Sequence, residues 1–340
     1  MESAQGGSPV KTTILILSDT HGMTLDGELP SQHADVAVHC GDLTEGSKLS
    51  EIRAALELLQ AVNAPLKLVI AGNHDFTLDT PSFRKKVDEA RPRLELELVR
   101  EAYGDYGEAI QLLADARAHS IHYLDEGTHR STLDNGAALT VYASPYTPSL
   151  GDWGFQYRPN DGHTYDIKPG TDIAVTHGPP LGILDRTDSS ERAGSSDLFA
   201  AVARSKPRIH CFGHIQEGWG AKLVTWRDTT TEQPSHLTDI DNEQSTAIES
   251  LSTLRPGKFD TPETASIKEA KVRRYADQKS CRTRHCSDDD NPLIAGRQTL
   301  FVNAAIQGDD QMPLHPPWLV TLELPRSTGD QNAEMSPAIE

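Results

Sequence analysis

Short apolar segments that end in Asp, Asn or His residues are the feature that most constrains the fold of this chain. Residues 11–17, 36–39 and 66–71 are runs of β-branched and leucine side chains, and each predicts a buried strand. The three runs end at SDTHG, CGDLTEG and GNHDF. Between the second and third runs, apolar residues recur at helical spacing over residues 47–62, which predicts an amphipathic helix. This order of elements predicts an α/β sandwich in which sequential strands pair.

Further strands and helices are predicted along the rest of the chain. The predicted strands are residues 139–143, 172–176, 208–212, 300–305 and 318–324. The second and third of these end at HGPPLG and GHIQEG, and we expect the last two to pair as a closing hairpin. Residues 81–118 are rich in Leu, Glu, Arg and Ala and predict one or two helices. Residues 197–204 predict a short helix capped by Ser196.

One domain is predicted over residues 11–325. Residues 227–296 are rich in Thr, Ser, Asp, Glu and Pro and show no clear apolar periodicity. The segment is too long for an ordinary loop, so it predicts a largely disordered acidic insertion within the domain. Residues 1–10 predict a flexible N-terminus, and residues 326–340 predict a solvated, disordered tail.

The acidic composition disfavours several kinds of partner. The 340 residues carry a formal net charge of -18, and a surface of this charge repels the phosphate backbone of nucleic acids. We therefore expect no DNA or RNA binding and no association with an anionic membrane. A small phosphate ester stays possible as a substrate, because a bound cation can reverse the local field. Protein partners are left open by the composition.

The sequence shows neither an export signal nor a membrane span. The N-terminal MESAQGGSPV lacks the basic and apolar parts of a signal peptide, and no apolar run approaches the ~20 residues that span a bilayer. The four cysteines, Cys40, Cys211, Cys281 and Cys286, are too scattered for a disulfide framework. We expect a reduced cytoplasmic protein, with the nucleus as an open alternative.

Polar clusters at the predicted strand ends are expected to meet in one crevice. The clusters are Asp19 with His21, Asp42, Asn73 with His74 and Asp75, His177, and His214. Taken singly, each is an ordinary turn residue or a surface histidine. In open α/β folds, however, the loops at the carboxyl ends of neighbouring strands converge where ligands bind. Mixed oxygen and nitrogen donors suit Mn, Fe, Zn or Ni, and the number of groups suits two ions better than one.

The ordered series DTH, GDLTEG, GNHDF, THGPPLG and GHIQEG resembles the motifs of the calcineurin-like metallophosphoesterase superfamily. The phrases SPYTPSLGDWGF, HGPPLGILD and LFVNAAI look closer still to the metallophosphoesterase domain-containing protein group. The resemblance covers residues 12 to about 226 and resumes near residue 298. It implies a four-layer αββα sandwich with two mixed β-sheets, in which the site lies at the strand ends.

The resemblance also implies ligands for two divalent metal ions, Mn²⁺ foremost, with Fe, Zn, Ni or Mg as alternatives. The implied ligands are Asp19 and His21 for the first ion, Asp42 as a bridge between both, and Asn73, His177 and His214 for the second. His74 would stay off the metals and face the substrate.

A dinuclear centre of this kind predicts hydrolysis of a small phosphate ester. We favour a phosphodiester or cyclic nucleotide over a monoester. Metal coordination lowers the pKa of a bridging water, and the resulting hydroxide would attack phosphorus in line. His74, if protonated, could donate to the leaving oxygen. Glu45 lies three residues past Asp42 and either orients His74 or is a solvated loop carboxylate.

Gln216 departs from the superfamily pattern, which at this loop is Gly-His-x-His with the second histidine on the first metal. The amide oxygen of Gln216 is a poorer ligand than imidazole, so the first metal is expected to bind loosely. An alternative follows from this departure: a nucleotide- or metal-binding regulatory or scaffold protein that has lost most catalysis. Three aromatic residues in nearby loops either stack on a flat leaving group or pack in the core; these are Trp153, Phe155 and Trp219.

Overall fold

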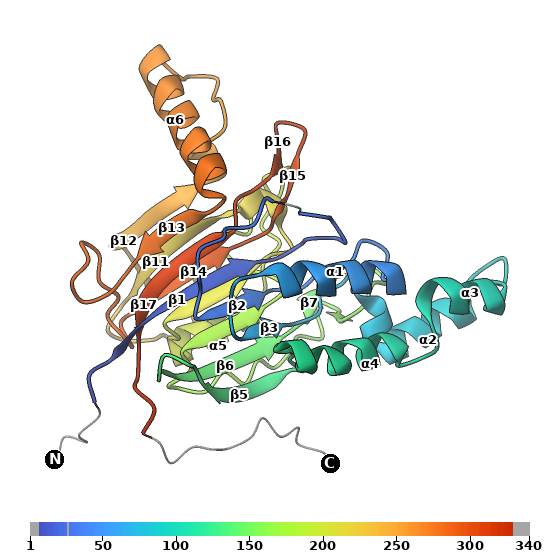
Figure 1. Ribbon diagram of the computed structural model, residues 1–340. Helices are drawn as coiled ribbons and strands as arrows, with labels where there is room; N and C mark the ends of the chain where they lie inside the picture. Colours follow the sequence, from blue (N-terminus) through green and yellow to red (C-terminus); the bar gives the residue numbers. More distant parts are fainter. Residues whose placement is uncertain (1–6, 26, 329–340) are drawn as a thin grey trace.

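Two mixed β-sheets packed face to face form the centre of the molecule (Figure 1). The structure is a computed structural model that describes residues 7–25 and 27–328. The first sheet has the strand order β13 (Cys281–Arg284), β17 (Trp318–Leu324), β1 (Val10–Leu17), β2 (Val36–His39), β3 (Lys67–Val69) and β4 (Ile121–Tyr123). In this sheet β1 pairs in parallel with β2 and antiparallel with β17.

The second sheet is also mixed. Its order is β12 (Ile240–Ser250), β11 (Gly220–Trp226), β14 (Gln298–Asn303), β10 (Ile209–Phe212), β9 (Ile173–Thr176), β6 (Ala138–Ser144) and β5 (Gly127–Thr132). The β6, β9, β10 and β14 strands are parallel to one another. At the two ends of this group, β5 pairs antiparallel with β6 and β11 antiparallel with β14, and β12 pairs antiparallel with β11. Two small ladders complete the strands, β7 (Thr147–Pro148) with β8 (Gln156–Tyr157) and β15 (Gln307–Asp309) with β16 (Met312–Leu314).

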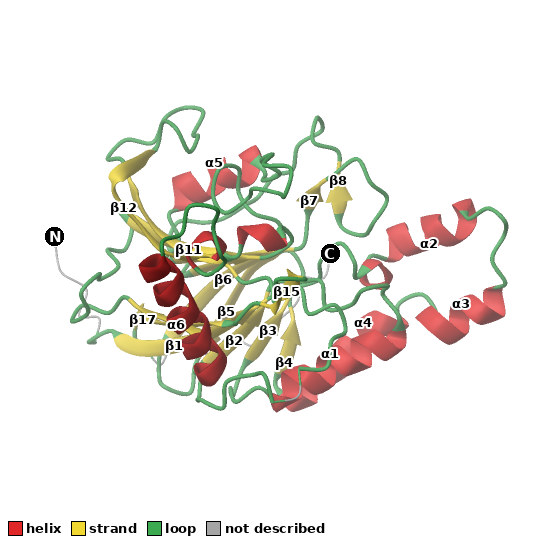
Figure 2. Ribbon diagram, turned by 90° about the horizontal axis from the view of Figure 1, so that it is seen from above, coloured by secondary structure: helices red, strands yellow, loops and turns green. Residues whose placement is uncertain are grey.

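Helices cover the outer faces of the two sheets, as Figure 2 shows from above. Against the first sheet lie α1 (Leu49–Ala61) and α4 (Glu108–Asp115), whose apolar side chains share one buried cluster with the outer side chains of that sheet. The helix α5 (Ser196–Ser205) covers the second sheet in the same way. A pair of helices, α2 (Thr80–Glu89) and α3 (Leu96–Tyr103), projects from the body of the molecule. The predicted four-layer αββα sandwich is therefore confirmed.

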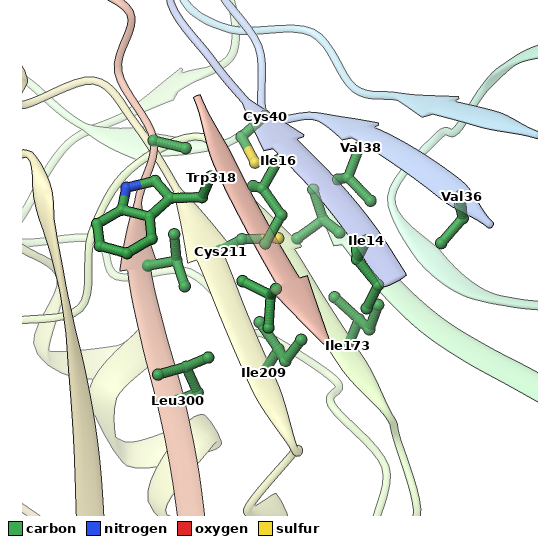
Figure 3. Close-up of a cluster of buried hydrophobic side chains, with 14 of the residues drawn as sticks. Ile14, Ile16, Val36, Val38, Cys40, Ile173, Ile209, Cys211, Leu300 and Trp318 are labelled. Atoms are coloured by element: carbon green, nitrogen blue, oxygen red, sulfur yellow. The ribbon is translucent and has the colours of Figure 1, made fainter. Parts of the chain in front are cut away.

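The main hydrophobic core lies between the sheets (Figure 3). Alternate residues of β1 and β2, such as Ile14 and Val38, face side chains of the second sheet, such as Ile173 and Ile209. Because successive strand side chains point to opposite faces, the neighbouring residues of the same strands are free to contact the helices. The buried apolar runs of the sequence are thus explained by strands covered on both faces.

The region expected to be largely disordered, residues 227–296, instead carries regular structure. It contains β12, α6 (Pro262–Gln278) and β13, and β12 pairs antiparallel with β11. Few of its side chains are buried: Tyr275 is the buried residue of α6, and the middle of β12 is exposed. An edge strand and a solvated helix need no apolar periodicity. Residues 227–296 therefore form regular structure although their sequence shows no periodic apolar pattern. The Tyr275 hydroxyl donates to Glu249 at 2.6 Å and ties the helix to the strand.

Three smaller expectations also differ from the structure or fall outside it. The strands β14 and β17 lie in different sheets, so the predicted closing hairpin is wrong. The cap of α5 is Ser195, whose hydroxyl accepts from the Leu198 amide, rather than Ser196. Residues 1–6 and 329–340, which include most of the predicted flexible ends, lie outside the described residues, while Val10 already belongs to β1.

Trp219 packs between the two sheets and is expected to contribute strongly to stability. Its ring is fully buried, stacks on Trp318 with centroids 5.1 Å apart, and donates from Nε1 to the Pro316 carbonyl at 3.1 Å. We expect Trp219→Ala to lower the free energy of unfolding by about 3–5 kcal/mol. Urea denaturation measures this change. The matched control is Trp153→Ala, because Trp153 is 37% exposed and its loss should cost at most about 1 kcal/mol.

Candidate metal centre

The polar clusters of the sequence follow strands that bring them to one edge of the sandwich. Asp19 and His21 follow β1, Asp42 follows β2, Asn73 and His74 follow β3, His177 follows β9, and His214 follows β10. The first three strands belong to the first sheet and the last two to the second. The isolated bridge between Ser18 and Ala305 joins the sheets at this edge. The candidate centre is therefore assembled from both sheets.

Four of the clustered residues have an unfavourable backbone conformation. The φ angles of Asp19, His21, Asp42 and His214 are 54°, 45°, 53° and 66°, in the left-handed region that non-glycine residues rarely adopt. Each such residue costs on the order of 1–3 kcal/mol, and residues of this kind concentrate at functional sites. The strands end in sharp turns here, and these turns direct the polar side chains inward.

Two glycines allow the backbone to approach the clustered side chains closely. A Cβ atom at Gly72 would lie 2.6 Å from the Cε1 atom of His177 and would also overlap Asp42. A Cβ atom at Gly213 would overlap the carboxylate of Asp19 and the side chain of Ser18. Larger residues at these two positions would displace the carboxylates, so both glycines are needed for the observed arrangement.

Asp42 lies at the centre of the cluster and belongs to two groups of potential metal donors. One group is His21, Asp42 and His74, and the other is Asp42, His177 and His214; in each, the donor atoms lie within 4.8 Å of one another. Its Oδ1 atom accepts from the His74 amide at 2.8 Å, which leaves Oδ2 facing the imidazoles. Burial raises the pKa of Asp42, but His177 and His21 outweigh this effect and hold it below its ordinary range.

The ring of His21 has polar atoms without hydrogen-bond partners. Its Nε2 atom lies 3.8 Å from Asp42 Oδ2 and 4.0 Å from Asp19 Oδ1, too far for a hydrogen bond to either. Its Nδ1 atom is 3.0 Å from Glu45 Oε2, but the angles do not make a hydrogen bond. A buried imidazole nitrogen without a partner is costly. The separations between His21 Nε2 and the carboxylate oxygens of Asp19 and Asp42 are those expected of atoms that bind the same divalent cation.

His177 presents its Nε2 atom to the oxygen donors of the second group. Its Nδ1 atom donates to the Cys40 carbonyl at 2.9 Å, an arrangement that fixes the orientation of metal-binding histidines. Nε2 then lies 3.2 Å from Asp42 Oδ2 and 3.0 Å from Asn73 Oδ1. Burial lowers the pKa of His177, but the Asp42 and Asp19 carboxylates raise it to about 9 overall.

Asp19 and His214 are held together by the backbone. Both carboxylate oxygens of Asp19 accept from the His214 amide, at 3.0 and 3.1 Å. Burial, reinforced by His177, lowers the pKa of the His214 imidazole to about 3, so the ring is neutral at pH 7 and able to bind a metal. Its centroid is 4.9 Å from that of His177.

His74 lies at the mouth of the cluster and is oriented by two contacts. Its Nδ1 atom lies 2.7 Å from the backbone carbonyl of Glu45, so Nδ1 carries the proton and Nε2 is left free. Its ring stacks on Trp153 with centroids 4.3 Å apart. The Glu45 carboxylate itself is 61% exposed and lies beside His21 rather than His74. Glu45 therefore contacts His74 through its main chain, which differs from the side-chain contact considered from the sequence.

Asp75 is a buried residue of the site that the sequence placed in a polar cluster without assigning it a role. It accepts from the Thr44 hydroxyl at 2.7 Å and from the amides of Leu43, Thr44 and Gly72. It thereby ties the loop after β2 to the loop after β3. Burial, with the Asp42 charge, raises its pKa to about 6. Its place directly after His74 in GNHDF was the available signal, but an Asp in a turn is too common for that signal to decide.

Gln216 begins the short turn Gln216–Gly218, and its side chain contacts Gln307. Its amide nitrogen donates to Gln307 Oε1 at 2.9 Å. Of the other aromatic residues considered from the sequence, Phe155 and Trp219 are buried in the core, and only Trp153 contacts the site. The carboxylate, amide and imidazole donors together fit two divalent cations, with Asp42 common to both.

Comparison with known families identifies the family of this chain. The sequence model of the family described as "Calcineurin-like phosphoesterase" matches residues 12–218, which is more than half of the chain. The chain belongs to the calcineurin-like phosphoesterase family. Members of this family are metal-dependent phosphoesterases, and the match ends within the loop that carries His214 and Gln216. The resemblance inferred from the motifs is thereby confirmed.

Several proteins are similar to this calcineurin-like phosphoesterase. Metallophosphoesterase domain-containing protein 1 of Homo sapiens is 33% identical over 62% of this chain and 63% of its own length. A protein of Emericella nidulans named "Probable rhamnogalacturonate lyase C" is 32% identical over 63% of this chain and 18% of its own length. The chain thus matches less than two thirds of the length of either relative.

Among solved structures, the purple acid phosphatase PPD1 from yellow lupin (Lupinus luteus) aligns with 94% of this chain and 55% of its own, at 9% identity and a TM-score of 0.34. In the part of the chain that the structure describes, no helix has the length and apolarity needed to cross a membrane.

Proposed function

We propose that this protein is a dinuclear metal-dependent phosphoesterase that hydrolyses a small phosphate ester, with a phosphodiester or cyclic nucleotide favoured over a monoester. The observation that carries the proposal is the position of Asp42 in both donor groups. One carboxylate shared by two cations a few ångströms apart is the usual design of centres that stabilise both oxygens of an in-line displacement at phosphorus. Mn²⁺ is the metal that we favour for both positions.

The reaction has two further requirements, a positive charge that attracts the phosphoryl group and a proton donor for the leaving oxygen. Divalent cations bound at the site would provide a net positive charge for the phosphoryl group and lower the pKa of coordinated water. His74 has a free Nε2 atom at the mouth of the site, with Nδ1 held by the Glu45 carbonyl. A proton carried on that Nε2 atom would be donated to the leaving oxygen. Trp153, stacked on the ring, keeps Nε2 in this direction.

The experiment that tests the proposal is hydrolysis of bis-p-nitrophenyl phosphate, cyclic nucleotides and p-nitrophenyl phosphate. Protein stripped of metal with a chelator is compared with the same protein reloaded with Mn²⁺. We expect hydrolysis only after reloading, and faster turnover of the diesters than of the monoester. Tight Mn²⁺ binding without hydrolysis of any of these esters would instead favour the alternative, a regulatory protein that binds metal or nucleotide.

We expect the Gln216→His variant to bind its first metal more tightly and to turn over faster than wild type. Imidazole is a better ligand than an amide for these cations, and the Gln216 amide is engaged with Gln307. The activity of metal-free protein, titrated with Mn²⁺, should reach half its maximum at roughly tenfold lower Mn²⁺ in the variant. The control is Gln307→His, which removes the same hydrogen bond from its other end. An unchanged Mn²⁺ dependence for Gln216→His would argue against a ligand role at this position.

A further inference from the structure

A cavity of about 590 Å³ adjoins the candidate metal centre, and we refer to it as the α2–α3 pocket. It lies where α2 and α3 project from the body of the molecule (Figures 1 and 2). Its wall includes Phe76, Phe83, Val87, Leu94, Val99 and Tyr103, and the loop at Gly151–Trp153 closes one side. No residue of the predicted metal centre lines it.

Trp153 connects this pocket to the metal centre. One part of its ring stacks on His74 at 4.3 Å, and the same residue lines the pocket. The His74 ring is in turn 4.8 Å from that of His21. Trp153 therefore lies between the pocket and the histidine that we propose as the donor to the leaving oxygen. A group attached to that oxygen would extend from His74 over Trp153 into the pocket.

The loop that carries Trp153 is fixed to the metal-binding loop by its backbone. The Gly154 amide donates to the Asn73 carbonyl at 3.0 Å, and the Phe155 amide donates to Asp79 Oδ2 at 2.8 Å. A Cβ atom at Gly154 would lie 2.8 Å from the Cα atom of Phe76, so the two loops are in direct contact. The position of the pocket relative to the metal centre is thus set before a ligand binds.

The floor of the pocket is apolar, and its rim is polar. Phe76, Phe83 and Val99 form a small buried cluster at the floor, with Val87 and Tyr103 packed beside them. The charges at the rim cancel, because Lys85 and Lys86 are balanced by Glu89 and Asp152. Lys86 lies 3.6 Å from Asp152, and its Nζ atom is 5.2 Å from the ring centroids of both Phe76 and Trp153. An anionic group gains little from a rim without net charge, whereas an apolar group gains by leaving water at the floor.

Leu94 extends the apolar surface of the pocket at its edge. It lines the pocket and is 48% exposed. An apolar chain or ring that fills the pocket would cover this side chain and remove it from water.

We propose that the α2–α3 pocket binds a large apolar leaving group, an alkyl or aryl alcohol, which selects a phosphodiester over a cyclic nucleotide among the substrates of the proposed function. This inference rests on the proposed function and specifies its substrate class. In the reaction, the oxygen of water bonds to phosphorus and the water releases one proton to solvent. The ester P–O bond breaks, the alcohol leaves with a proton donated by His74, and His74 regains a proton from solvent. The alcohol then occupies the α2–α3 pocket.

The experiment measures binding of alkylphosphonates, from methyl to hexyl, to Mn²⁺-loaded protein by isothermal titration calorimetry. Phosphonates cannot be hydrolysed, so this measurement tests the pocket separately from catalysis. We expect affinity to rise by about threefold for each added methylene, slightly less than full burial would give. The Leu94→Asp variant should bind methylphosphonate with the same affinity as wild type. Its affinity for hexylphosphonate should be at least about tenfold lower than that of wild type.

The matched control is Leu98→Asp, which adds the same charge to the same helical hairpin at a position that does not line the pocket and is 59% exposed. It should keep the full chain-length dependence. Hexylphosphonate binding within twofold of methylphosphonate in wild type would overturn the inference, as would equal losses in the two variants. Absence of bis-p-nitrophenyl phosphate hydrolysis with the chain-length dependence intact would count against the proposed function alone.

Discussion

We expect the Asp42→Asn variant to hydrolyse bis-p-nitrophenyl phosphate on the order of a thousandfold more slowly than wild type. Asp42 belongs to both donor groups, and a neutral carboxamide cannot offer an anionic oxygen to each of two cations. The substitution preserves the side-chain shape, and the new amide oxygen can still accept from the His74 amide, as Asp42 Oδ1 does at 2.8 Å. Steady-state rates in saturating Mn²⁺, together with bound metal per chain, measure the effect.

The control for this variant is Asp172→Asn. Asp172 is also buried and paired with a neighbour, with its carboxylate 3.1 Å from Arg208, but it lies just before β9, at the opposite end of that strand from His177. The Asp172→Asn substitution should change the free energy of unfolding and leave the rate of bis-p-nitrophenyl phosphate hydrolysis per folded molecule unaltered. Retention of more than a tenth of the wild-type rate by Asp42→Asn would contradict the bridging role.

We expect His74→Asn to lower kcat by about 10²–10⁴-fold while leaving the metal content unchanged. The reason is that His74 has a free Nε2 atom at the mouth of the site, directed by its contacts with the Glu45 carbonyl and Trp153. Single-turnover rates and metal content measured on the same preparation test both parts. His33→Asn, at an exposed histidine, is the matched control.

The metal content decides between two roles for His74. The donor atoms of His21, Asp42 and His74 lie within 4.8 Å of one another, so the geometry also allows His74 to be a ligand. Loss of one metal ion together with activity would assign His74 as a ligand of the first metal. Loss of activity with both ions present would assign it to proton transfer.

The central strands of the fold were predictable because they are buried on both faces. Residues 11–17 and 36–39 are continuous apolar runs, and the structure places β1 and β2 there almost to the residue. Among the elements that sequence reasoning missed, β12 and α6 bury few side chains and are held by pairs such as Tyr275 with Glu249. Such contacts join positions far apart in the chain and leave no periodic signal.

The residues of the candidate site were also predictable, because they directly follow strands that the sequence identifies. Polar residues that end parallel strands of one sheet lie at one edge, which groups Asp19 with Asp42 in the first sheet. That His177 of the second sheet would meet them was expected from convergence of the loops, but it depends on how the two sheets pack. The contacts of Trp153 and Asp75 could not be predicted in this way, because they depend on loop conformations. Glu45 shows the same limit: its place after Asp42 was informative, but which of its atoms reaches His74 depends on the turn.

A dinuclear metal centre is the claim on which the other functional expectations depend. Anomalous diffraction from crystals of Mn²⁺-loaded protein, collected on both sides of the manganese absorption edge, tests it most directly. The account predicts two anomalous peaks within coordination distance of Asp42, one beside His21 and one beside His177 and His214. Anomalous density confined to other parts of the protein, such as the exposed carboxylates near Cys286, would contradict it.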